Sequence, residues 1–388
     1  MFLSLDSGGY WSLGGASIKV MSSVDLHSIW SEAISGGGSV AVWRLPHTDQ
    51  FHILADMQPS RGMLDVDKSD FGFAISPFLN SDGTETIFLK DDIYAVFNAD
   101  ELSDFNTSAE YHVGSCLNRD VSGNREHFLK MVESGMHAIA DAKFDKVVPA
   151  RTLDIPLPDS FNLLKLFAEI SANSPNAFVS LISIPEIGTW MGATPEMLIE
   201  STSRYFRTVS LAGTQAFVEG MDLSMAAWTQ KEIEEQAMVS RYVIEQFKTI
   251  RLRAFIEKGP RTIRAGSMIH LKSEYYVDLD QVEFVDLGSR MLRLLHPTSA
   301  VCGMPREAAL KFIIENEGIN RELYSGFLGP VNKDGVTQLY VNLRCMQLLD
   351  STAVLYAGAG VTYDSIPEKE WDETMLKCHT LLDLFNHE

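Results

Sequence analysis

The chain contains 388 residues, 45% of them hydrophobic and 22% charged, which is the composition of a soluble globular protein with a large core. Its formal net charge of −20 argues against nucleic acid and anionic membranes as partners. No apolar run is long enough to cross a bilayer and the start lacks the basic region of a signal peptide, so we expect a cytoplasmic protein.

The four cysteines show no paired spacing, which fits free thiols in a reducing compartment and not a zinc site. They are Cys116, Cys302, Cys345 and Cys378. The excess of acidic residues also bears on the kind of ligand the protein can bind. An acidic protein that binds an anionic substrate must reverse the field locally, with clustered Arg and Lys or with a bound cation.

The first third of the chain is typical of short strands joined by turns. We expect residues 1–20 to be a poorly ordered extension, with Met21 as an alternative translation start. Gly36-Gly-Gly-Ser39 is a flexible turn and not a phosphate loop, because no Lys-Ser/Thr pair follows it. The predicted strands are residues 39–45, 71–75, 86–90 and 93–97.

From residue 124 to 142 the pattern becomes helical, and a strand follows at residues 146–151. After residue 160, helices and strands alternate irregularly, which favours an α+β fold over a regular βαβ array. No low-complexity linker divides the chain. We therefore expect residues 1–120 to be a β-rich part of the same fold as residues 121–388.

The last helix carries the most informative pattern. Ser365 and Glu368 have capping-box spacing and Pro367 suits the first turn. Beside the apolar stripe, Glu370, Glu373 and Lys377 fall within roughly 60° of one another on the helix. Two such carboxylates can share a divalent cation, and the lysine can hold an anion. The stripe itself consists of Trp371, Met375, Cys378, Leu382 and Phe385.

A helix expected at about residues 222–258 repeats this arrangement. Glu232 and Glu235 are three residues apart, and the apolar stripe starts between them. The repeat predicts two helices that present carboxylate pairs to a common cleft. From spacing alone, solvated carboxylates on two amphipathic helices fit equally well. The apolar positions are Ile233, Ala237, Ile244 and Phe247.

Short blocks in chain order make residues 124–388 resemble the chorismate-utilising enzymes, which include isochorismate, salicylate, anthranilate and aminodeoxychorismate synthases. The first blocks are Lys146-Val-Val-Pro-Ala-Arg151, Gly192-Ala-Thr-Pro-Glu196, Leu211-Ala-Gly-Thr214, Glu232-Ile-Glu-Glu235-Gln236 and His270-Leu-Lys-Ser273. The later blocks are His296-Pro-Thr-Ser-Ala-Val-Cys-Gly303-Met-Pro305, Arg321-Glu-Leu-Tyr324-Ser-Gly326, Val341-Asn-Leu-Arg344, Ala357-Gly-Ala-Gly360 and the last helix.

This resemblance implies α/β/β/α layers with the active site between two sheets. It also implies binding of chorismate, with Mg²⁺ on the ring carboxylate. The metal carboxylates would be Glu235 and Glu373, with Glu232 and Glu370 in support, directly or through water. Mg²⁺ keeps several waters and takes few protein carboxylates, which suits such a set. The ion and nearby cations would supply the positive pocket that the acidic chain requires.

By the same resemblance, Arg344 grips the enolpyruvyl carboxylate with help from Tyr324. The planar fork of arginine meets a carboxylate with two parallel hydrogen bonds. We expect Arg344 on a continuous strand, residues 339–349, sharing a face with Tyr340, Asn342 and Met346. The other predicted substrate-binding residues are Lys377, Gly358, Gly360, His296, Thr214, Gly213 and Ala300.

The resemblance also separates the possible reactions. Lys146 occupies the position of the base in isochorismate and salicylate synthases, although alone it would be assigned as a solvated edge lysine. Glu196, after Gly192-Ala-Thr-Pro, would be the acid that protonates the departing C4 hydroxyl. Ala300 favours isochorismate synthase over salicylate synthase, the first alternative. Anthranilate or aminodeoxychorismate synthesis and a non-catalytic chorismate-binding homologue are the remaining alternatives.

Gln236 departs from the family pattern, in which His usually follows the metal glutamate. No segment resembles a glutaminase, so we expect no glutaminase subunit and a monomer or weak homodimer. The product would feed menaquinone or siderophore synthesis.

Overall fold

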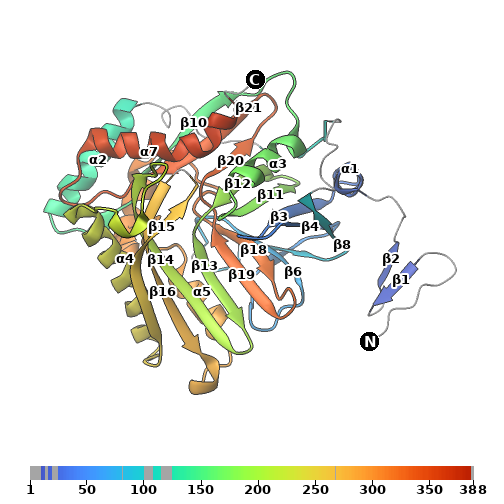
Figure 1. Cartoon of the computed structure of the whole chain (residues 1–388), viewed down its shortest axis with the longest axis horizontal. Helices are drawn as coiled ribbons and strands as arrows, with labels where there is room; N and C mark the ends of the chain where they lie inside the picture. The colour runs from blue at the N-terminus through green and yellow to red at the C-terminus, as the bar shows by residue number, and fades with distance from the viewer. Residues whose placement is uncertain are drawn as a thin grey trace.

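Residues 10–13, 16–19, 25–80, 82–99, 108–114, 125–266 and 268–385 are described by the computed structural model. Most of the described strands form two large antiparallel sheets, which lie between two outer layers of helices (Figure 1). The predicted α+β fold with α/β/β/α layers is therefore confirmed. Met21 and Cys116 lie outside the described residues, whereas Tyr10–Leu13 (β1) and Ala16–Lys19 (β2) pair as a hairpin.

The first sheet has the strand order β10-β21-β20-β12-β11-β3-β4-β8. Its strands are rich in Val, Ile and aromatic residues, and β11 and β12 are buried along their whole length. In sheet order the bounds are Ala150–Pro156, Thr352–Gly358, Cys345–Leu348, Gly188–Thr194, Phe178–Ile184, Ser39–Arg44, Gln50–Asp56 and Ile93–Asn98.

The second sheet has the strand order β15-β16-β14-β13-β19-β18-β6-β7-β5. Its bounds, in that order, are Ile256–Ala265, Met268–Asp278, Tyr205–Ala216, Met197–Thr202, Val336–Val341, Phe327–Val331, Gly72–Ser76, Thr86–Lys90 and Ser60–Gly62. Strands from before residue 100 thus enter both sheets, so the amino-terminal part is interleaved with the rest of the fold.

Helices cover the outer face of each sheet. Helices α1 (Leu26–Ser35), α3 (Leu163–Asn173) and α7 (Pro367–Leu382) share a hydrophobic core with the first sheet. Helices α4 (Gln230–Thr249) and α5 (Leu287–Leu295) pack on the second. A third core fills the space between the sheets, where Trp43, Phe73 and Tyr340 are buried.

A smaller core at one end joins α2 (Arg125–Ala140) and α6 (Arg306–Asn316) to a short two-stranded sheet. That sheet pairs β9 (Lys146–Val147) with β17 (Gly303–Met304). Val147 also bridges Val361, which brings Lys146 beside the segment that leads into α7. Single 3₁₀ turns at Leu223–Met225, Leu279–Gln281 and Asp383–Phe385 complete the described elements.

The predicted continuous strand at residues 339–349 is wrong. Strand β19 ends at Val341 in the second sheet and β20 begins at Cys345 in the first, so residues 342–344 cross between the sheets. Arg344 has φ 49°, a conformation that few residues other than glycine adopt. Such an outlier persists only where the surroundings enforce it, and it occurs often at functional sites.

Two helix predictions also need correction. The helix expected at 222–258 is α4, Gln230–Thr249, and the last three residues of the expected range belong to β15. Helix α7 starts at Pro367 with Ile366 as its N-cap and no side-chain cap. The Ser365 hydroxyl instead accepts a hydrogen bond from the backbone N–H of Thr362 at 3.0 Å. The predicted capping box of the last helix is therefore wrong.

The buried face of α7 also differs from the predicted apolar stripe. Only Cys378 of the stripe is fully buried, and the other stripe residues are half-buried. Phe385 lies beyond the end of the helix. The other buried residues of α7 are Glu370, Thr374 and Leu381. A buried glutamate and threonine on this face indicate polar contacts where the sequence predicted apolar packing.

Candidate active site

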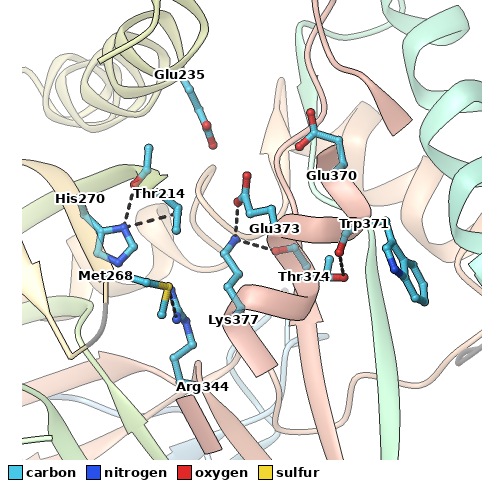
Figure 2. Close-up of polar contacts among 12 residues, drawn as sticks. Thr214, Glu235, Met268, His270, Arg344, Glu370, Trp371, Glu373, Thr374 and Lys377 are labelled. Carbon is cyan, nitrogen blue, oxygen red and sulfur yellow. Dashed lines mark hydrogen bonds and ion pairs between the residues drawn. The ribbon is translucent and has the colours of Figure 1, made fainter. Parts of the chain in front are cut away.

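A cavity between the ends of the two sheets gathers most of the residues predicted from the sequence. It lies where α4 and α7 approach strands β14, β16 and β21 (Figures 1 and 2). Predicted residues that line it are Glu196, Gly213, Thr214, Glu235, Ala300, Tyr324, Arg344, Gly358, Gly360, Glu373 and Lys377. Side chains from segments more than 100 residues apart therefore face one space.

Lys146 reaches the wall of this cavity behind Gly360. Its side chain is fully buried, and its ammonium lies 2.9 Å from Oε1 of Glu235. A β-carbon on Gly360 would lie 2.5 Å from that oxygen and 3.1 Å from Cε of Lys146. Glycine at position 360 is thus what allows the lysine and the glutamate to meet at the cavity.

Three glutamates at or beside the cavity each pair with a lysine. Lys146 pairs with Glu235, Lys377 with Glu373 at 2.8 Å, and Lys231 with Glu370. Lys377 also donates to the carbonyl of Gly358 at 2.7 Å. Figure 2 shows Glu235, Glu373 and Lys377 converging from α4 and α7. The three ammonium charges offset the three carboxylates, so the net positive charge that an anionic ligand requires must come from Arg344, which has no carboxylate partner among the described residues.

The pKa values of two carboxyl groups in this region move in opposite directions. Burial raises the pKa of Glu196 to about 7, although Lys146 and Lys377 act against the rise. Burial would also raise the pKa of Glu235, but the ammonium groups of Lys146 and Lys231 hold it below its usual value. One carboxyl group can therefore carry a proton near neutral pH while the other stays ionised, which separates an acid from an anion.

Arg344 is a buried cation that contacts only neutral groups. Its side chain is 8% exposed, and Nη1 lies 3.0 Å from Sδ of Met268 and 3.2 Å from Oγ1 of Thr380. Burial lowers the pKa of Arg344 to about 10. No ion pair joins it to a carboxylate in the described part of the chain. A guanidinium buried in this way can accept an anionic ligand at the cavity.

Tyr324 forms part of the same wall as Arg344. Its ring stacks on Tyr356 with centroids 5.4 Å apart, and burial raises its pKa above the usual value. Its hydroxyl therefore stays protonated and available as a hydrogen-bond donor.

The histidine that lines the cavity is His270, whereas the sequence predicted His296. His296 lies away from the cavity, where its Nε2 donates to the carbonyl of Pro77 at 3.1 Å. Burial lowers the pKa of His296 to about 4. The structure does not place His296 among the substrate-binding residues predicted for this site.

His270 lines the cavity beside Thr214 (Figure 2). Its Nδ1 lies 2.7 Å from the carbonyl oxygen of Gly213, so Nδ1 carries the proton. Burial lowers the pKa of His270 to about 3, and its Nε2 is a buried acceptor with no hydrogen-bond partner among the described residues. The sequence placed His270 in a family block, and alternation along the strand would have shown that it shares a face with Lys272.

Glu232 stabilises the N-terminus of α4 and is not a cavity residue. It completes a capping box with Thr229, whose backbone N–H donates to it at 2.7 Å, and Gln215 donates to both of its oxygens. Glu370 is buried beside the cavity and does not line it. Burial raises the pKa of Glu370, and its Oε2 has no hydrogen-bond partner among the described residues. In the described ranges, no three acidic, His or Cys side chains lie close enough to bind a metal by themselves.

Gln236 lies behind the cavity and not in it. Its amide donates to Ser210 at 2.9 Å and to Ser273 at 3.4 Å, which joins α4 to strands β14 and β16. The residue that departs from the family pattern therefore acts on the packing of the helix that carries Glu235.

A cavity with a buried arginine, lysine–glutamate pairs and one carboxyl group with a pKa near neutrality can bind a small anion and offer it a proton. The chain belongs to the chorismate binding enzymes, whose family model matches residues 84–386.

Curated relatives include isochorismate synthase EntC of Escherichia coli K12, 28% identical over 66% of this chain and 66% of that protein. Isochorismate synthase DhbC of Bacillus subtilis 168 is 28% identical over 66% of this chain and 67% of its own length. Each alignment thus spans about two thirds of the relative. Among solved structures, MenF, the menaquinone-specific isochorismate synthase from Escherichia coli, has the same fold: TM-score 0.74, 20% identity, 93% of this chain and 91% of that one. Within the described ranges, no helix is long and apolar enough to cross a membrane.

Proposed function

We propose that this enzyme isomerises chorismate to isochorismate with the help of Mg²⁺. The observation that carries the proposal is that Glu196, Arg344 and the Lys146-bound Glu235 line one cavity, and that among the described residues Arg344 hydrogen-bonds only neutral groups. Relatives named isochorismate synthase support it. The reaction adds a hydroxyl at C2 of chorismate and removes the hydroxyl from C4, so it needs a base and an acid at opposite positions.

Chorismate is a dicarboxylate, and the cavity offers cationic groups for both ends. Arg344 would hold the enolpyruvyl carboxylate with two parallel hydrogen bonds, and the Tyr324 hydroxyl would donate a third. Lys377 also lines the cavity, where it pairs with Glu373. His270 would accept a hydrogen bond from a ring hydroxyl through Nε2, because its pKa keeps the ring neutral.

The residues present fit Mg²⁺. Glu235 and Glu373 line one cavity, and Mg²⁺ needs only one or two protein carboxylates beside waters and substrate oxygens. Glu370 is buried beside the cavity and would support the site, directly or through water. When bound, the ion supplies positive charge that holds the ring carboxylate. Glu232 is engaged in the helix cap, so we propose no direct contact from it.

In the proposed reaction, Lys146 first releases its own proton to solvent, and the neutral amine then accepts a proton from the water that attacks C2, which restores the ammonium; Glu196 regains its proton from solvent after turnover. Glu196 donates its proton to the C4 hydroxyl, which leaves as water while the ring double bonds shift. The pKa of about 7 keeps Glu196 partly protonated at neutral pH, as this role requires. Water is consumed at C2 and released at C4, so the net change is an isomerisation.

Product analysis tests this function against its alternatives. The enzyme is incubated with chorismate and Mg²⁺, with and without ammonium, and the products are separated by chromatography. We expect isochorismate without pyruvate, no effect of ammonium, and no turnover after removal of Mg²⁺ by chelation. Stoichiometric pyruvate would instead identify a salicylate synthase. An amine product would overturn the assignment to water attack.

Replacing Arg344 by methionine should weaken chorismate binding without destabilising the fold. Hydrogen bonds to a charged group contribute about 1.5–3 kcal/mol, so we expect KM to rise by about 10- to 100-fold. The free energy of unfolding should not fall, because the variant removes a buried charge that has no carboxylate partner. Steady-state kinetics and urea denaturation measure the two effects. A large loss of stability with an unchanged KM would show a purely structural role.

A further inference from the structure

Arg151 is a buried arginine that the proposed reaction does not use. It lies in β10 at the end of the block that begins with Lys146, and it is 1% exposed. It does not line the cavity. Its side chain points instead toward α7, the helix that carries Glu373 and Lys377.

The guanidinium of Arg151 holds one face of α7. Nε donates to Oγ1 of Thr374 at 2.7 Å, and Nη2 lies 2.7 Å from Sδ of Met375. Its Cζ lies 3.9 Å from the ring centroid of Trp371, within cation–π range. The remaining contact, from Nη1 to the carbonyl of Thr152 at 3.3 Å, fixes the side chain to its own strand.

All of these partners are neutral, and no ion pair involves Arg151 in the described part of the chain. Burying a cation among neutral groups is unfavourable, and an apolar side chain of similar length would fill the space without that cost. What arginine adds is a rigid planar fork that binds several partners in a fixed geometry. The contacts therefore indicate that the orientation of α7 is the property being fixed.

The orientation of α7 determines where its cavity residues lie. Each residue turns the helix by 100°, so the face held by Arg151 and the face that carries Glu373 and Lys377 rotate together. Trp371 also contacts Phe128 of α2, at 5.9 Å between ring centroids. The Trp371 ring thus contacts both Arg151 of β10 and Phe128 of α2, which connects α7 to both elements.

We propose that Arg151 is a positioning residue that fixes the rotation of α7 and thereby places Glu373 and Lys377 for binding of the metal and the substrate. Its effect on Mg²⁺ and chorismate rests on the proposed function. Its effect on the helix does not.

The test compares Arg151→Lys with Arg44→Lys in the full-length protein. Arg44 is a matched control because it is also buried (4% exposed) and its guanidinium donates to neutral carbonyls, including that of Ser174 at 2.6 Å. It lies in β3, and four strands separate β3 from β10 in the same sheet. Thr374→Val, which removes the acceptor of Nε, is a milder second variant should Arg151→Lys fail to fold.

Three measurements separate positioning from stability. Hydrogen exchange reports on the amides of Pro367–Leu382, calorimetry gives the Kd of Mg²⁺, and kinetics give KM and kcat for chorismate. In Arg151→Lys and Thr374→Val we expect faster exchange in α7 and a rise of about tenfold in Kd and KM, with a smaller change in kcat. Arg44→Lys should lose stability without these three changes.

The proposal is overturned if Arg151→Lys and Arg44→Lys show the same exchange in α7, or if Kd and KM stay within about twofold of the unmodified enzyme. If the unmodified protein neither converts chorismate nor binds Mg²⁺, the proposed function fails. Hydrogen exchange in α7 still decides the role of Arg151 in that case.

Discussion

Replacing Glu196 by glutamine is expected to lower kcat by about 10²- to 10⁴-fold, the usual contribution of a general acid. Glutamine has the shape of a neutral carboxyl group, so the buried position should tolerate it. It cannot donate an acidic proton to the leaving hydroxyl. Chorismate should therefore still raise the unfolding temperature of the variant while turnover is lost. Product assays measure turnover, and thermal unfolding with and without chorismate measures binding.

The pH dependence of turnover gives the same assignment independently. An acid with a pKa of about 7 is protonated below neutrality, so kcat/KM of the unmodified enzyme should fall as pH rises through about 7. The residual activity of Glu196→Gln should lack this descending limb. If Glu196→Gln kept the fall in kcat/KM as pH rises through about 7, that fall would report the ionisation of another group.

Stability should depend on the same ionisation. The folded-state pKa of Glu196 lies above the ordinary value of 4.5, so its contribution is fully present below pH 4.5 and is lost as pH rises through about 7. A shift of this size corresponds to a difference on the order of 3 kcal/mol. Relative to the unmodified protein, Glu196→Gln should therefore gain stability between pH 5 and pH 8 in urea denaturation.

Glu200→Gln is the matched control for these experiments. Glu200 is also a buried glutamate, in β13, and it accepts hydrogen bonds from Arg207 at 2.9 Å and Gln338 at 2.7 Å. It does not line the cavity. Glu200→Gln should keep the kcat of the unmodified enzyme and the same fall in kcat/KM with rising pH. Full activity of Glu196→Gln under the same conditions would contradict the assignment of the acid.

Elements with a strong local pattern were predictable from the sequence. The helix expected at 124–142 is α2, Arg125–Ala140, and the strands expected at 39–45 and 86–90 are β3 and β7. Local periodicity determines such elements. The break before Arg344 was not predictable, because Tyr340, Asn342 and Met346 alternate as one strand would. Only the packing of two sheets requires the chain to cross between them at this point.

Site residues were found where a block of sequence carries them, and missed where the partner is distant. Lys231 meets Glu370 from 139 positions away, so no spacing rule could pair them. The Thr229–Glu232 capping box is different, because its three-residue spacing is visible in the sequence and already assigns that glutamate to a helix start. That His270 in β16, and not His296 at the end of α5, reaches the cavity depends on how these elements pack, which is a tertiary property.

Replacing Lys146 by methionine is expected to abolish turnover, with a loss in kcat of about 10²- to 10⁴-fold. The variant keeps the length of the side chain and removes the group that would accept a proton from water. Lys146 and Glu196 act at one cavity: the ammonium lies 2.9 Å from a cavity-lining carboxylate, and its charge acts on the pKa of Glu196. Chorismate binding through Arg344 should survive, as a chorismate-dependent rise in unfolding temperature would show.

Lys146→Met should also lose stability, since Glu235 keeps its charge in a buried position without its nearest partner. Breaking a buried pair in this way costs up to about 3–5 kcal/mol, so activity must be measured well below the unfolding temperature of the variant. Lys272→Met provides the control, because Lys272 forms a similar pair with Glu274 at 3.0 Å outside the cavity. Loss of turnover in both variants would trace the effect to general destabilisation. Turnover near the unmodified level in Lys146→Met would exclude this lysine as the base, because no proton acceptor would then remain at its position beside Glu235.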